Sequence, residues 1–309
     1  MNIKNATILI TERCNSKCFM CSIWKQKECF SEMTPMQYRE FFGRPDFSGL
    51  KDVNISGGEA TLRNDIADVT EAILKGKHLD MFFLSTNGTN PSGALDCLRA
   101  AQKYSNLIYL CVSIDGDRQT NMQVRGIDSY EIALKTIEIC KQWNSNIVTN
   151  ISLTLTPRNT EHEVLEYVRN LAVRYKSTYS FRFAYNNEFY FHNNAIDLAH
   201  SNEKKNMVMQ FIKDYTYDDS FMKIQYEYLR TGKIDLMMND DNVCCGAGEK
   251  FVLVKPNGDV YPCINSNHLI GDYENGIYDG SYIPGQYEKC PCCVELCVWP
   301  NISWGNRLS

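Results

Sequence analysis

Short apolar runs alternate with longer amphipathic stretches along roughly the first 185 residues of this chain. The short runs are rich in aliphatic and aromatic side chains and end at polar or turn-forming residues, which is typical of strands buried on both faces. They predict six strands, at residues 6–11, 52–56, 79–85, 107–114, 147–156 and 179–185.

The amphipathic stretches between these runs predict helices. The first is well delimited, because Thr34 is a favoured N-cap residue and Pro35 a favoured first helical residue. We expect helices at 35–42, 65–74, 92–102, 129–143 and 160–174, and two more after the last strand at 203–214 and 221–229. Residues 186–200 are polar and aromatic and are predicted to form a loop.

Strand and helix alternate six times in this order, which predicts a parallel sheet flanked by helices. Alternation by itself does not choose between an open sheet and a barrel. In either fold, the loops at the carboxyl ends of the strands carry the functional site. The short polar motifs of the chain all fall at this edge.

A different pattern begins near residue 239. A β-hairpin is predicted there, with strands at 251–255 and 260–261, because the Asn257-Gly258 dipeptide is a strong turn signal between alternating strands. The change predicts two domains, an α/β domain at 1–238 and a small, cysteine-rich α+β domain at 239–309.

The 309 residues suffice for one large domain and a small second one, and their hydrophobic and charged fractions are ordinary for a globular protein. The chain has no apolar run of membrane-spanning length, and its first residues lack the features of a signal peptide. We therefore expect a cytoplasmic protein without a membrane partner. The net charge of −5 argues against nucleic acid as a partner.

The chain has fourteen cysteines, and without a signal peptide this number predicts metal binding or catalysis rather than disulfides. Three of them, Cys14, Cys18 and Cys21, form a C-x3-C-x2-C motif after the first strand. Three thiolates on one loop can hold three corners of a [4Fe–4S] cluster and leave the fourth iron open. A structural zinc site is one alternative, although such sites use four ligands, and three ordinary buried thiols are another.

This motif and three others resemble the signature of the radical S-adenosylmethionine (SAM) enzymes. The pattern C-x3-C-x-Φ-C follows the first strand, with Met20 where an aromatic residue is usual. The other three motifs follow the next strands in order, at Ser56-Gly57-Gly58-Glu59, Ser85-Thr86-Asn87-Gly88 and Ser113-Ile114-Asp115-Gly116. The resemblance covers nearly the whole chain and implies a partial (β/α)6 TIM-like barrel.

The resemblance also implies how SAM and the cluster are held. The three cysteines of the first motif bind the cluster. Glu59, together with the Gly57-Gly58 backbone, holds the amino group of SAM. Further residues at the ends of strands four, five and six are expected near the SAM ribose, its carboxylate or the substrate: Ser113, Asp115, Asn150 and Arg182.

A second group of cysteines belongs to the predicted small domain. Thiolates at the open ends of a hairpin and on a C-x2-C pair can close a tetrahedral site, for zinc or for an iron–sulfur cluster. The spacing around the hairpin resembles the auxiliary-cluster domain called SPASM, in its shortened twitch form. The resemblance implies one auxiliary [4Fe–4S] cluster on Cys245, Cys263, Cys290 and Cys293. A neighbouring cysteine, Cys244, Cys292 or Cys297, can replace one of these ligands.

The family chemistry is reductive cleavage of SAM to a 5′-deoxyadenosyl radical, which abstracts hydrogen from a substrate carbon. The electron is expected from a one-electron reductant such as flavodoxin or ferredoxin. We expect oxidation or epimerisation of a sugar- or aminoglycoside-like molecule in natural-product biosynthesis, because no leader-binding module precedes the barrel.

Two other functions are open. One is the epimerisation or crosslinking of a ribosomally made peptide. The other is a non-catalytic iron–sulfur or zinc protein, which would not need the SAM-holding residues. If the reaction is an epimerisation, a thiol that is not a cluster ligand must return the hydrogen, and Cys244 is the expected donor.

Overall fold

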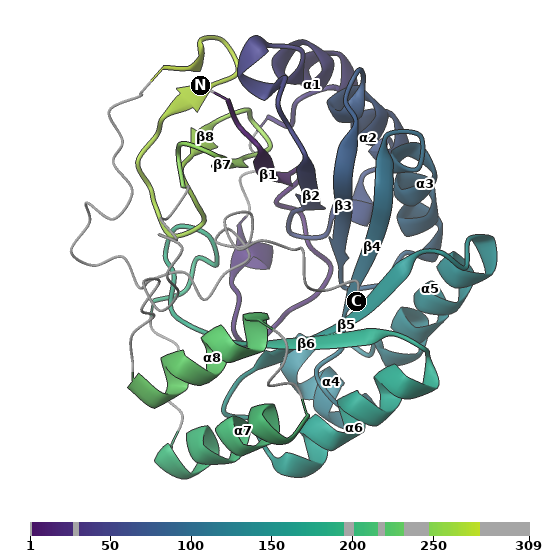
Figure 1. The fold of residues 1–309 in the computed structure, drawn as a ribbon, viewed down its shortest axis with the longest axis vertical. Helices are drawn as coiled ribbons and strands as arrows, with labels where there is room; N and C mark the ends of the chain where they lie inside the picture. The colour runs from purple at the N-terminus through teal and green to yellow at the C-terminus, as the bar shows by residue number, and fades with distance from the viewer. Residues whose placement is uncertain (1, 27–30, 195–200, 216–219, 232–246, 279–309) are drawn as a thin grey trace.

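The computed structural model describes residues 2–26, 31–194, 201–215, 220–231 and 247–278. Six parallel strands run side by side in chain order and curve into a partial barrel (Figure 1). They are β1 (Asn5–Leu9), β2 (Asp52–Ser56), β3 (Leu79–Thr86), β4 (Ser105–Ser113), β5 (Val148–Leu155) and β6 (Thr178–Phe183). The predicted α/β class and barrel are confirmed, because each of these strands pairs in parallel with the next.

Helices cover the outer face of the sheet (Figure 1). Those between the strands are α1 (Pro35–Phe42), α2 (Ile66–Leu74), α3 (Pro91–Ala101), α4 (Arg118–Arg125), α5 (Tyr130–Trp143) and α6 (His162–Arg174), and α7 (Asn202–Tyr215) and α8 (Ser220–Thr231) follow β6. Every predicted helix and strand is present, with its ends within two residues of the prediction. The prediction missed α4 and three short 3-10 helices, Ile23–Lys25, Pro45–Phe47 and Ala60–Leu62.

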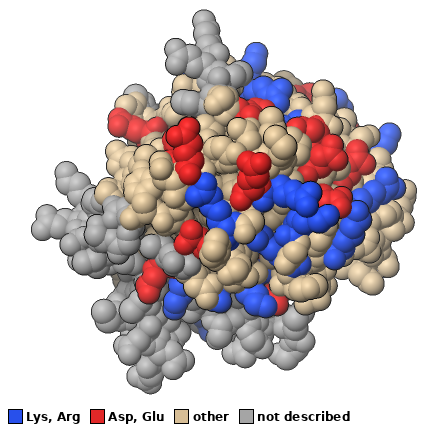
Figure 2. All heavy atoms as spheres, turned by 90° about the horizontal axis from the view of Figure 1, so that it is seen from above, with Lys and Arg blue, Asp and Glu red and all other residues tan. Residues whose placement is uncertain are grey.

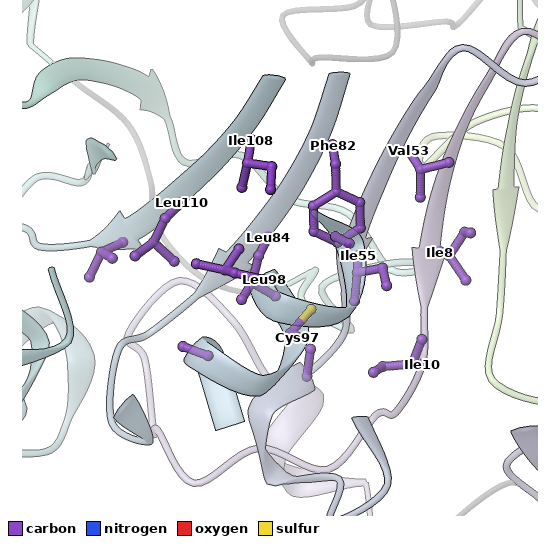
Figure 3. Close-up of a cluster of buried hydrophobic side chains, with 14 of the residues drawn as sticks. Ile8, Ile10, Val53, Ile55, Phe82, Leu84, Cys97, Leu98, Ile108 and Leu110 are labelled. Atoms are coloured by element: carbon purple, nitrogen blue, oxygen red, sulfur yellow. The ribbon is translucent and has the colours of Figure 1, made fainter. Parts of the chain in front are cut away.

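Alternate residues of the strands form the core between the sheet and the helices. Figure 3 shows Ile55, Phe82 and Leu84 on the strands facing Cys97 and Leu98 of α3. All five side chains are fully buried, and burying one large apolar side chain stabilises a fold by roughly 1.5–3 kcal/mol. The intervening residues of the same strands face the inside of the barrel, where the site lies. They are more often polar than the residues that face the helices.

Four further strands extend the sheet beyond β1. These are β7 (Phe251–Val254), β8 (Val260–Tyr261), β9 (Gly271–Asp272) and β10 (Gly276–Ile277), and the sheet order is β10-β9-β8-β7-β1-β2-β3-β4-β5-β6. The predicted hairpin is confirmed, because β7 and β8 pair antiparallel. The parallel pairing of β7 with β1, from Asn5 opposite Phe251 to Ile8 opposite Val254, was not predicted. One sheet therefore continues across the predicted domain boundary, and the division at residue 239 stays a prediction.

Charged side chains of both signs lie beside one another on the face seen from above (Figure 2). Pairs of exposed opposite charges contribute only about 0–1 kcal/mol each to stability. In the parts of the chain that the structure describes, no helix is long and apolar enough to cross a membrane.

Asp52, at the start of β2, predicts a pH-dependent stability. Burial and then the nearby negative charge of Asp80 raise the pKa of Asp52 to about 6. A carboxyl group whose pKa is higher in the folded state than in the unfolded state stabilises the folded state at pH values below the unfolded-state pKa. That stabilisation is lost as the pH rises through the folded-state pKa. Asp52→Asn removes the charge, so we expect it to raise the unfolding free energy at pH 7.5 by about 1 kcal/mol, a value reduced for partial exposure.

The measurement is thermal unfolding of parent and variant at pH 7.5 and pH 4.5. The stabilisation should shrink at the lower pH, where the parent carboxyl is protonated in the folded state. A gain of equal size at both pH values would contradict this assignment.

Candidate active site

The carboxyl ends of the barrel strands meet around a cavity of about 200 Å³. Each strand contributes polar residues at or just after its end. From β1 to β6 these include Cys14, Ser16, Cys18, Cys21, Ser56, Gly57, Gly58, Glu59, Thr86, Asn87, Ser113, Ser152, Thr154 and Arg182. The structure therefore brings together the three cysteines and most of the residues that the sequence predicts at the site.

The cysteine loop donates backbone hydrogen bonds to two other segments of the chain. Lys17 N donates to Arg125 O at 2.9 Å, and Phe19 N donates to Val124 O at 2.8 Å, so the loop lies against the last turn of α4. On the other side, Ser22 N donates to Phe191 O at 2.8 Å. The loop is thus fixed by its neighbours and does not depend on its own turns alone.

Side-chain amides fix the same loop. Asn87 Nδ2, at the end of β3, donates to Asn15 Oδ1 and to Ser16 Oγ, each at 2.8 Å. Asn193 is buried, and its Nδ2 donates to Met20 O. The third predicted motif, Ser85-Thr86-Asn87-Gly88, therefore acts on the cysteine loop through Asn87.

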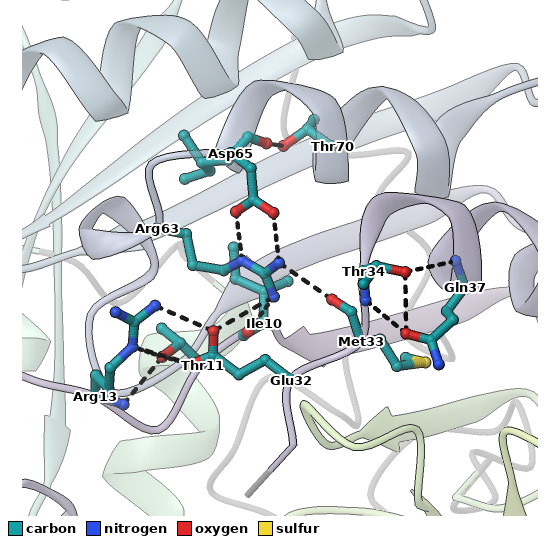
Figure 4. Close-up of polar contacts among 11 residues, drawn as sticks. Ile10, Thr11, Arg13, Glu32, Met33, Thr34, Gln37, Arg63, Asp65 and Thr70 are labelled. Atoms are coloured by element: carbon teal, nitrogen blue, oxygen red, sulfur yellow. Dashed lines mark hydrogen bonds and ion pairs between the residues drawn. The ribbon is translucent and has the colours of Figure 1, made fainter. Parts of the chain in front are cut away.

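A buried arginine fixes the chain just before the cysteine loop (Figure 4). Arg63 is 5% exposed and donates to Ile10 O at 3.0 Å and to Met33 O at 3.1 Å. Its guanidinium also forms two hydrogen bonds with Asp65, at 2.8 and 2.7 Å. Arg63 thus ties the end of β1 to the start of α1, which orients the segment that leads into the cysteines.

The backbone of the second motif lies directly against the segment that precedes Cys14. Gly58 N donates to Thr11 O and Glu59 N donates to Arg13 O, each at 2.8 Å. A Cβ atom on Gly57 would lie 2.5 Å from Thr11 O, and one on Gly58 would lie 2.4 Å from Arg13 O. Glycine is therefore required here for the close approach of two backbones, in addition to any contact with SAM.

The Glu59 carboxylate is buried and has four hydrogen-bond donors. Oε1 accepts from Thr61 N, Thr61 Oγ1 and Thr86 Oγ1 at 3.1, 2.6 and 2.7 Å, and Oε2 accepts from Asn87 N at 2.6 Å. Oε1 can accept no further hydrogen bond, whereas Oε2 can still accept one. Glu59 lines the cavity, so the predicted contact with the SAM amino group can use only Oε2 or the backbone.

The three cysteine thiols line one end of the cavity and are half-buried. Burial raises the pKa of Cys14 to about 12 and that of Cys21 to about 11, and it raises the pKa of Cys18 as well. A cluster that binds here takes these thiols as thiolates and releases their protons. Zinc–sulfur bonds of about 2.3 Å require thiolates within roughly 4 Å of one another.

Within the described part of the chain, no three such side chains are close enough to hold a single metal ion. A four-iron cluster is larger than one ion and is bound by thiols that stand further apart. The cavity in front of the three thiols is continuous with the polar strand ends. Three thiols of one loop beside an open cavity fit a cluster with one open iron.

Asp115 does not line the cavity, although the sequence predicts it near the ribose or the substrate. Its side chain is fully buried and accepts from Thr154 N at 2.7 Å and from Arg125 Nη2 at 3.1 Å. Oδ2 also lies 2.5 Å from Arg125 Nε. Asp115 thus acts through Arg125, a cavity-lining residue that the prediction missed because it ends the unpredicted helix α4.

Asn150 also lies away from the cavity, contrary to the position expected for it. It is the third residue of β5, near the amino end of the strand, and its side chain bonds to Thr178 Oγ1 and Ser180 Oγ of β6. Ser152 and Thr154, further along the same strand, line the cavity instead. The prediction placed Asn150 at the wrong end of the strand, whereas Ser113 and Arg182 lie at the cavity as expected.

Aromatic and aliphatic side chains also line the cavity, and together we call them the aromatic wall. It consists of side chains from outside the six barrel strands: Trp24, Tyr185, Tyr190, Phe191, Phe251 and Ile264. Phe191 packs edge-to-face against Tyr190 and Tyr185, with ring centroids 4.7 and 5.6 Å apart. The prediction named none of these residues. The aromatic content of residues 186–200 was the available signal.

Cys263 is the one member of the second cysteine group within the described residues. It is 3% exposed, follows β8, and its Sγ accepts from Asn265 N at 3.4 Å. Asn187 Nδ2 donates to the neighbouring Ile264 O at 3.0 Å, which joins this segment to the loop after β6. The other predicted ligands and donors of this group, Cys244, Cys245, Cys290, Cys292, Cys293 and Cys297, lie outside the described residues.

A partial parallel barrel with three thiols of one loop at its carboxyl edge has the architecture of an iron–sulfur enzyme. Residues 8–171, more than half of the chain, match the model of the Radical SAM superfamily, and the chain belongs to that superfamily. Enzymes of this superfamily use a [4Fe–4S] cluster and SAM.

The relatives to which the chain is similar are named for different activities. The chain is 29% identical to a probable GTP 3′,8-cyclase of Pyrococcus abyssi over 137 residues, which is 44% of this chain and 43% of the relative. It is 22% identical over 268 residues to the antilisterial bacteriocin subtilosin biosynthesis protein AlbA of Bacillus subtilis, covering 84% of this chain and 54% of the relative. The chain thus spans about half the length of these curated relatives or less.

The fold is similar to that of Streptococcus suis SuiB bound to its precursor peptide SuiA, with a TM-score of 0.69. The match covers 96% of this chain and 71% of SuiB at 17% sequence identity. A second SuiB structure, bound to S-adenosylmethionine, matches with a TM-score of 0.63 over 85% of this chain and 60% of SuiB, again at 17% identity. These matches extend the shared fold past the barrel and over most of the chain.

Proposed function

We propose that this chain is a radical SAM enzyme that modifies a ribosomally made peptide. The observation that carries the proposal is the mixed lining of the cavity, which contains three thiols and polar strand-end residues together with aromatic side chains. Peptide modification was the alternative to a sugar-like substrate in the sequence analysis. It is now the better supported of the two, because relatives with long matches, AlbA and SuiB, are named for a bacteriocin and a precursor peptide.

The polar part of the cavity lining is suited to SAM. A [4Fe–4S] cluster with SAM supplies hydrogen-atom abstraction at an unactivated carbon, and the protein supplies binding and orientation. Cys14, Cys18 and Cys21 would hold the cluster. The Gly57-Gly58 backbone and Oε2 of Glu59 are placed to accept hydrogen bonds from the SAM amino group.

Two arginines and several hydroxyl-bearing side chains also belong to the polar part of the lining. Arg125 and Arg182 are the cavity-lining cations among the described residues, and a carboxylate is the part of SAM that needs one. Ser113, Ser152 and Thr154 offer hydroxyl groups between them, suited to a ribose. Ser113 and Arg182 thus keep the roles that the sequence analysis gave them, and Arg125, Ser152 and Thr154 replace Asn150 and Asp115.

The aromatic wall is suited to the substrate. Flat rings of Tyr185, Tyr190 and Phe191 cover apolar surface and exclude water, which suits an aliphatic or aromatic peptide side chain better than a polyhydroxylated sugar. Excluding water also protects a reactive carbon centre from side reactions. The wall thus favours a peptide residue with an apolar side chain as the group that is modified.

The test uses enzyme reconstituted anaerobically with iron and sulfide, then supplied with SAM and dithionite. Short peptides encoded beside the gene are compared with a panel of aminoglycosides. We expect 5′-deoxyadenosine to form in step with a mass change of a peptide, and not with any aminoglycoside. A loss of two mass units indicates oxidation or crosslinking, and deuterium uptake from heavy water indicates epimerisation. Turnover of an aminoglycoside with the peptides unchanged would contradict the proposal.

A second prediction concerns the auxiliary cluster. Two [4Fe–4S] clusters correspond to about eight irons per chain. Cys263 is the described member of the proposed ligand set, so Cys263→Ala should lower the count to about four irons and leave the cluster of the first motif intact.

The measurement is iron and sulfide content together with zinc analysis. The matched control is Cys97→Ala, a buried cysteine of α3 in the outer core. About four irons in both the parent and the Cys263→Ala protein, or zinc in the parent, would contradict a second cluster.

A further inference from the structure

Arg125 is a buried cation beside one of the three cysteine sulfurs. The residue is 7% exposed, and its Nη1 lies 3.9 Å from Cys18 Sγ. Its other nitrogens contact the fully buried Asp115, with Nε 2.5 Å from Oδ2 and Nη2 3.1 Å from Oδ1. The guanidinium therefore lies between a carboxylate and a cluster-binding sulfur, away from bulk water.

Helix α4 fixes the position of Arg125 relative to the cysteine loop. The helix is capped at its start by Asp117, whose side chain accepts from Thr120 N, and at its end by Gly126, which has the left-handed conformation with φ at +69°. A Cβ atom on Gly126 would lie 2.4 Å from Lys17 O. Because Arg125 O and Val124 O also accept from the loop, the guanidinium and Cys18 are held by the same short turn.

Asp115 is itself fixed on several sides. Its carboxylate accepts from Thr154 N at 2.7 Å. Its backbone N donates to Asn121 Oδ1 at 2.9 Å, and its backbone O accepts from Asn159 Nδ2 at 3.1 Å. The ion pair is therefore rigid, and its two charges keep their places relative to the cysteine loop.

We propose that Arg125, positioned by Asp115, raises the reduction potential of the cluster bound at Cys14, Cys18 and Cys21. Reduction adds one electron, and the cluster with its three thiolates becomes one unit more negative. A fixed positive charge next to a ligand sulfur stabilises the more negative state, and burial prevents water from screening it. The proposal depends on the superfamily's cluster and not on the nature of the substrate.

The two charges of the pair act on Cys18 with opposite signs. Arg125 Nη1 lies 3.9 Å from Cys18 Sγ, whereas the Asp115 carboxylate contacts Nε and Nη2 of the same guanidinium. The pair therefore acts on this sulfur as a net positive charge, and the carboxylate of Asp115 reduces its magnitude. Removing either partner should shift the potential, and the two shifts should have opposite signs.

The test is the reduction potential of the cluster in reconstituted protein, followed by electron paramagnetic resonance during titration with dithionite. SAM is left out of the titration, so that a lost contact with SAM cannot cause a shift. The signal is assigned to this cluster by its change when SAM is added to a separate sample.

Arg125→Gln should lower the ratio of reduced to oxidised cluster at a fixed ambient potential by roughly tenfold, which is about 59 mV for a one-electron couple. The control is Arg118→Gln, which removes the same charge from the exposed start of α4, where Arg118 pairs with Asp128. The control should leave the potential unchanged, because solvent screens that charge.

Two further variants separate charge from structure. Arg125→Lys keeps the positive charge and should shift the potential less than Arg125→Gln does. Asp115→Asn should raise the potential, because the guanidinium then acts without its counter-charge. These two variants decide the question if Arg125→Gln fails to bind a cluster. An unchanged potential in Arg125→Gln, equal shifts in the Lys and Gln variants, or a lowered potential in Asp115→Asn would overturn the proposal.

Discussion

Replacing Cys18 with alanine is expected to reduce 5′-deoxyadenosine formation to background while the fold survives. All three thiolates are needed to hold three corners of a cluster and leave one iron for SAM. Cys18 lies on a loop whose backbone is held by α4, so losing one sulfur should not release the loop. The measurement is 5′-deoxyadenosine released per hour under dithionite, together with the circular dichroism spectrum. Cys14→Ala and Cys21→Ala should behave in the same way.

The control for this prediction is Cys140→Ala. Cys140 is fully buried on α5, in the outer core. Removing its sulfur should cost about 1 kcal/mol of unfolding free energy and leave SAM cleavage unchanged. Cleavage at the parent rate in Cys18→Ala would mean that another set of residues holds the cluster.

A second large effect is expected from Gly58→Ala. The new methyl group would lie 2.4 Å from Arg13 O and 2.6 Å from Glu12 O, so the backbones of the two loops must separate. That movement would break the hydrogen bonds from Gly58 N and Glu59 N to the segment just before Cys14. We expect a loss of about 2 kcal/mol in unfolding free energy, and a cluster content after reconstitution below half of the parent value.

Gly76→Ala is the matched control for this substitution. Gly76 has φ at +76°, but no atom lies within 4 Å of an added Cβ. The variant should therefore lose about 1 kcal/mol to backbone strain and keep its full iron content. If Gly58→Ala loses no more iron than Gly76→Ala, then the close backbone approach does not position the cysteine loop.

The barrel was predictable because its signals are local. Runs such as Ile108-Tyr109-Leu110-Cys111-Val112 cannot be mistaken for amphipathic helices, and the alternation of such runs with helices implies a parallel sheet. The order of short motifs at the strand ends was local too. Cys14, Cys18, Cys21 and Ser113 belong to these motifs and were therefore placed at the cavity, and Arg182 was placed there through the family resemblance.

Helix α4 was missed because it lacks the usual apolar stripe. Val124 is its one buried aliphatic residue, so hydrophobic periodicity gave no signal. The caps were nevertheless present, with Asp117 before the helix and Gly126 after it. With α4 absent from the prediction, the buried partner of Asp115 could not be found, and the carboxylate was assigned directly to the site.

Other features depend on contacts between distant residues. Nothing local in Phe251–Val254 indicates that this strand lies parallel to β1. The aromatic wall likewise combines residues from Trp24 to Ile264, which only the folded chain brings to one cavity. The misplacement of Asn150 has another cause. The period of two puts Asn150 on the same face of the strand as Ser152 and Thr154, but its place early in the predicted strand 147–156 already puts it away from the carboxyl end that carries the site.

The pairing of β1 with β7 also has a consequence for synthesis of the chain. β1 leaves the ribosome well before its partner strand, which begins at Phe251. At about 5–20 residues per second, roughly 12–50 seconds separate the two strands. Throughout that time one edge of β1, including Ile8, has no partner strand and is available to chaperones or to other nascent chains. Conditions that slow translation lengthen this interval, so the yield of folded protein should depend on chaperone capacity as well as on thermodynamic stability.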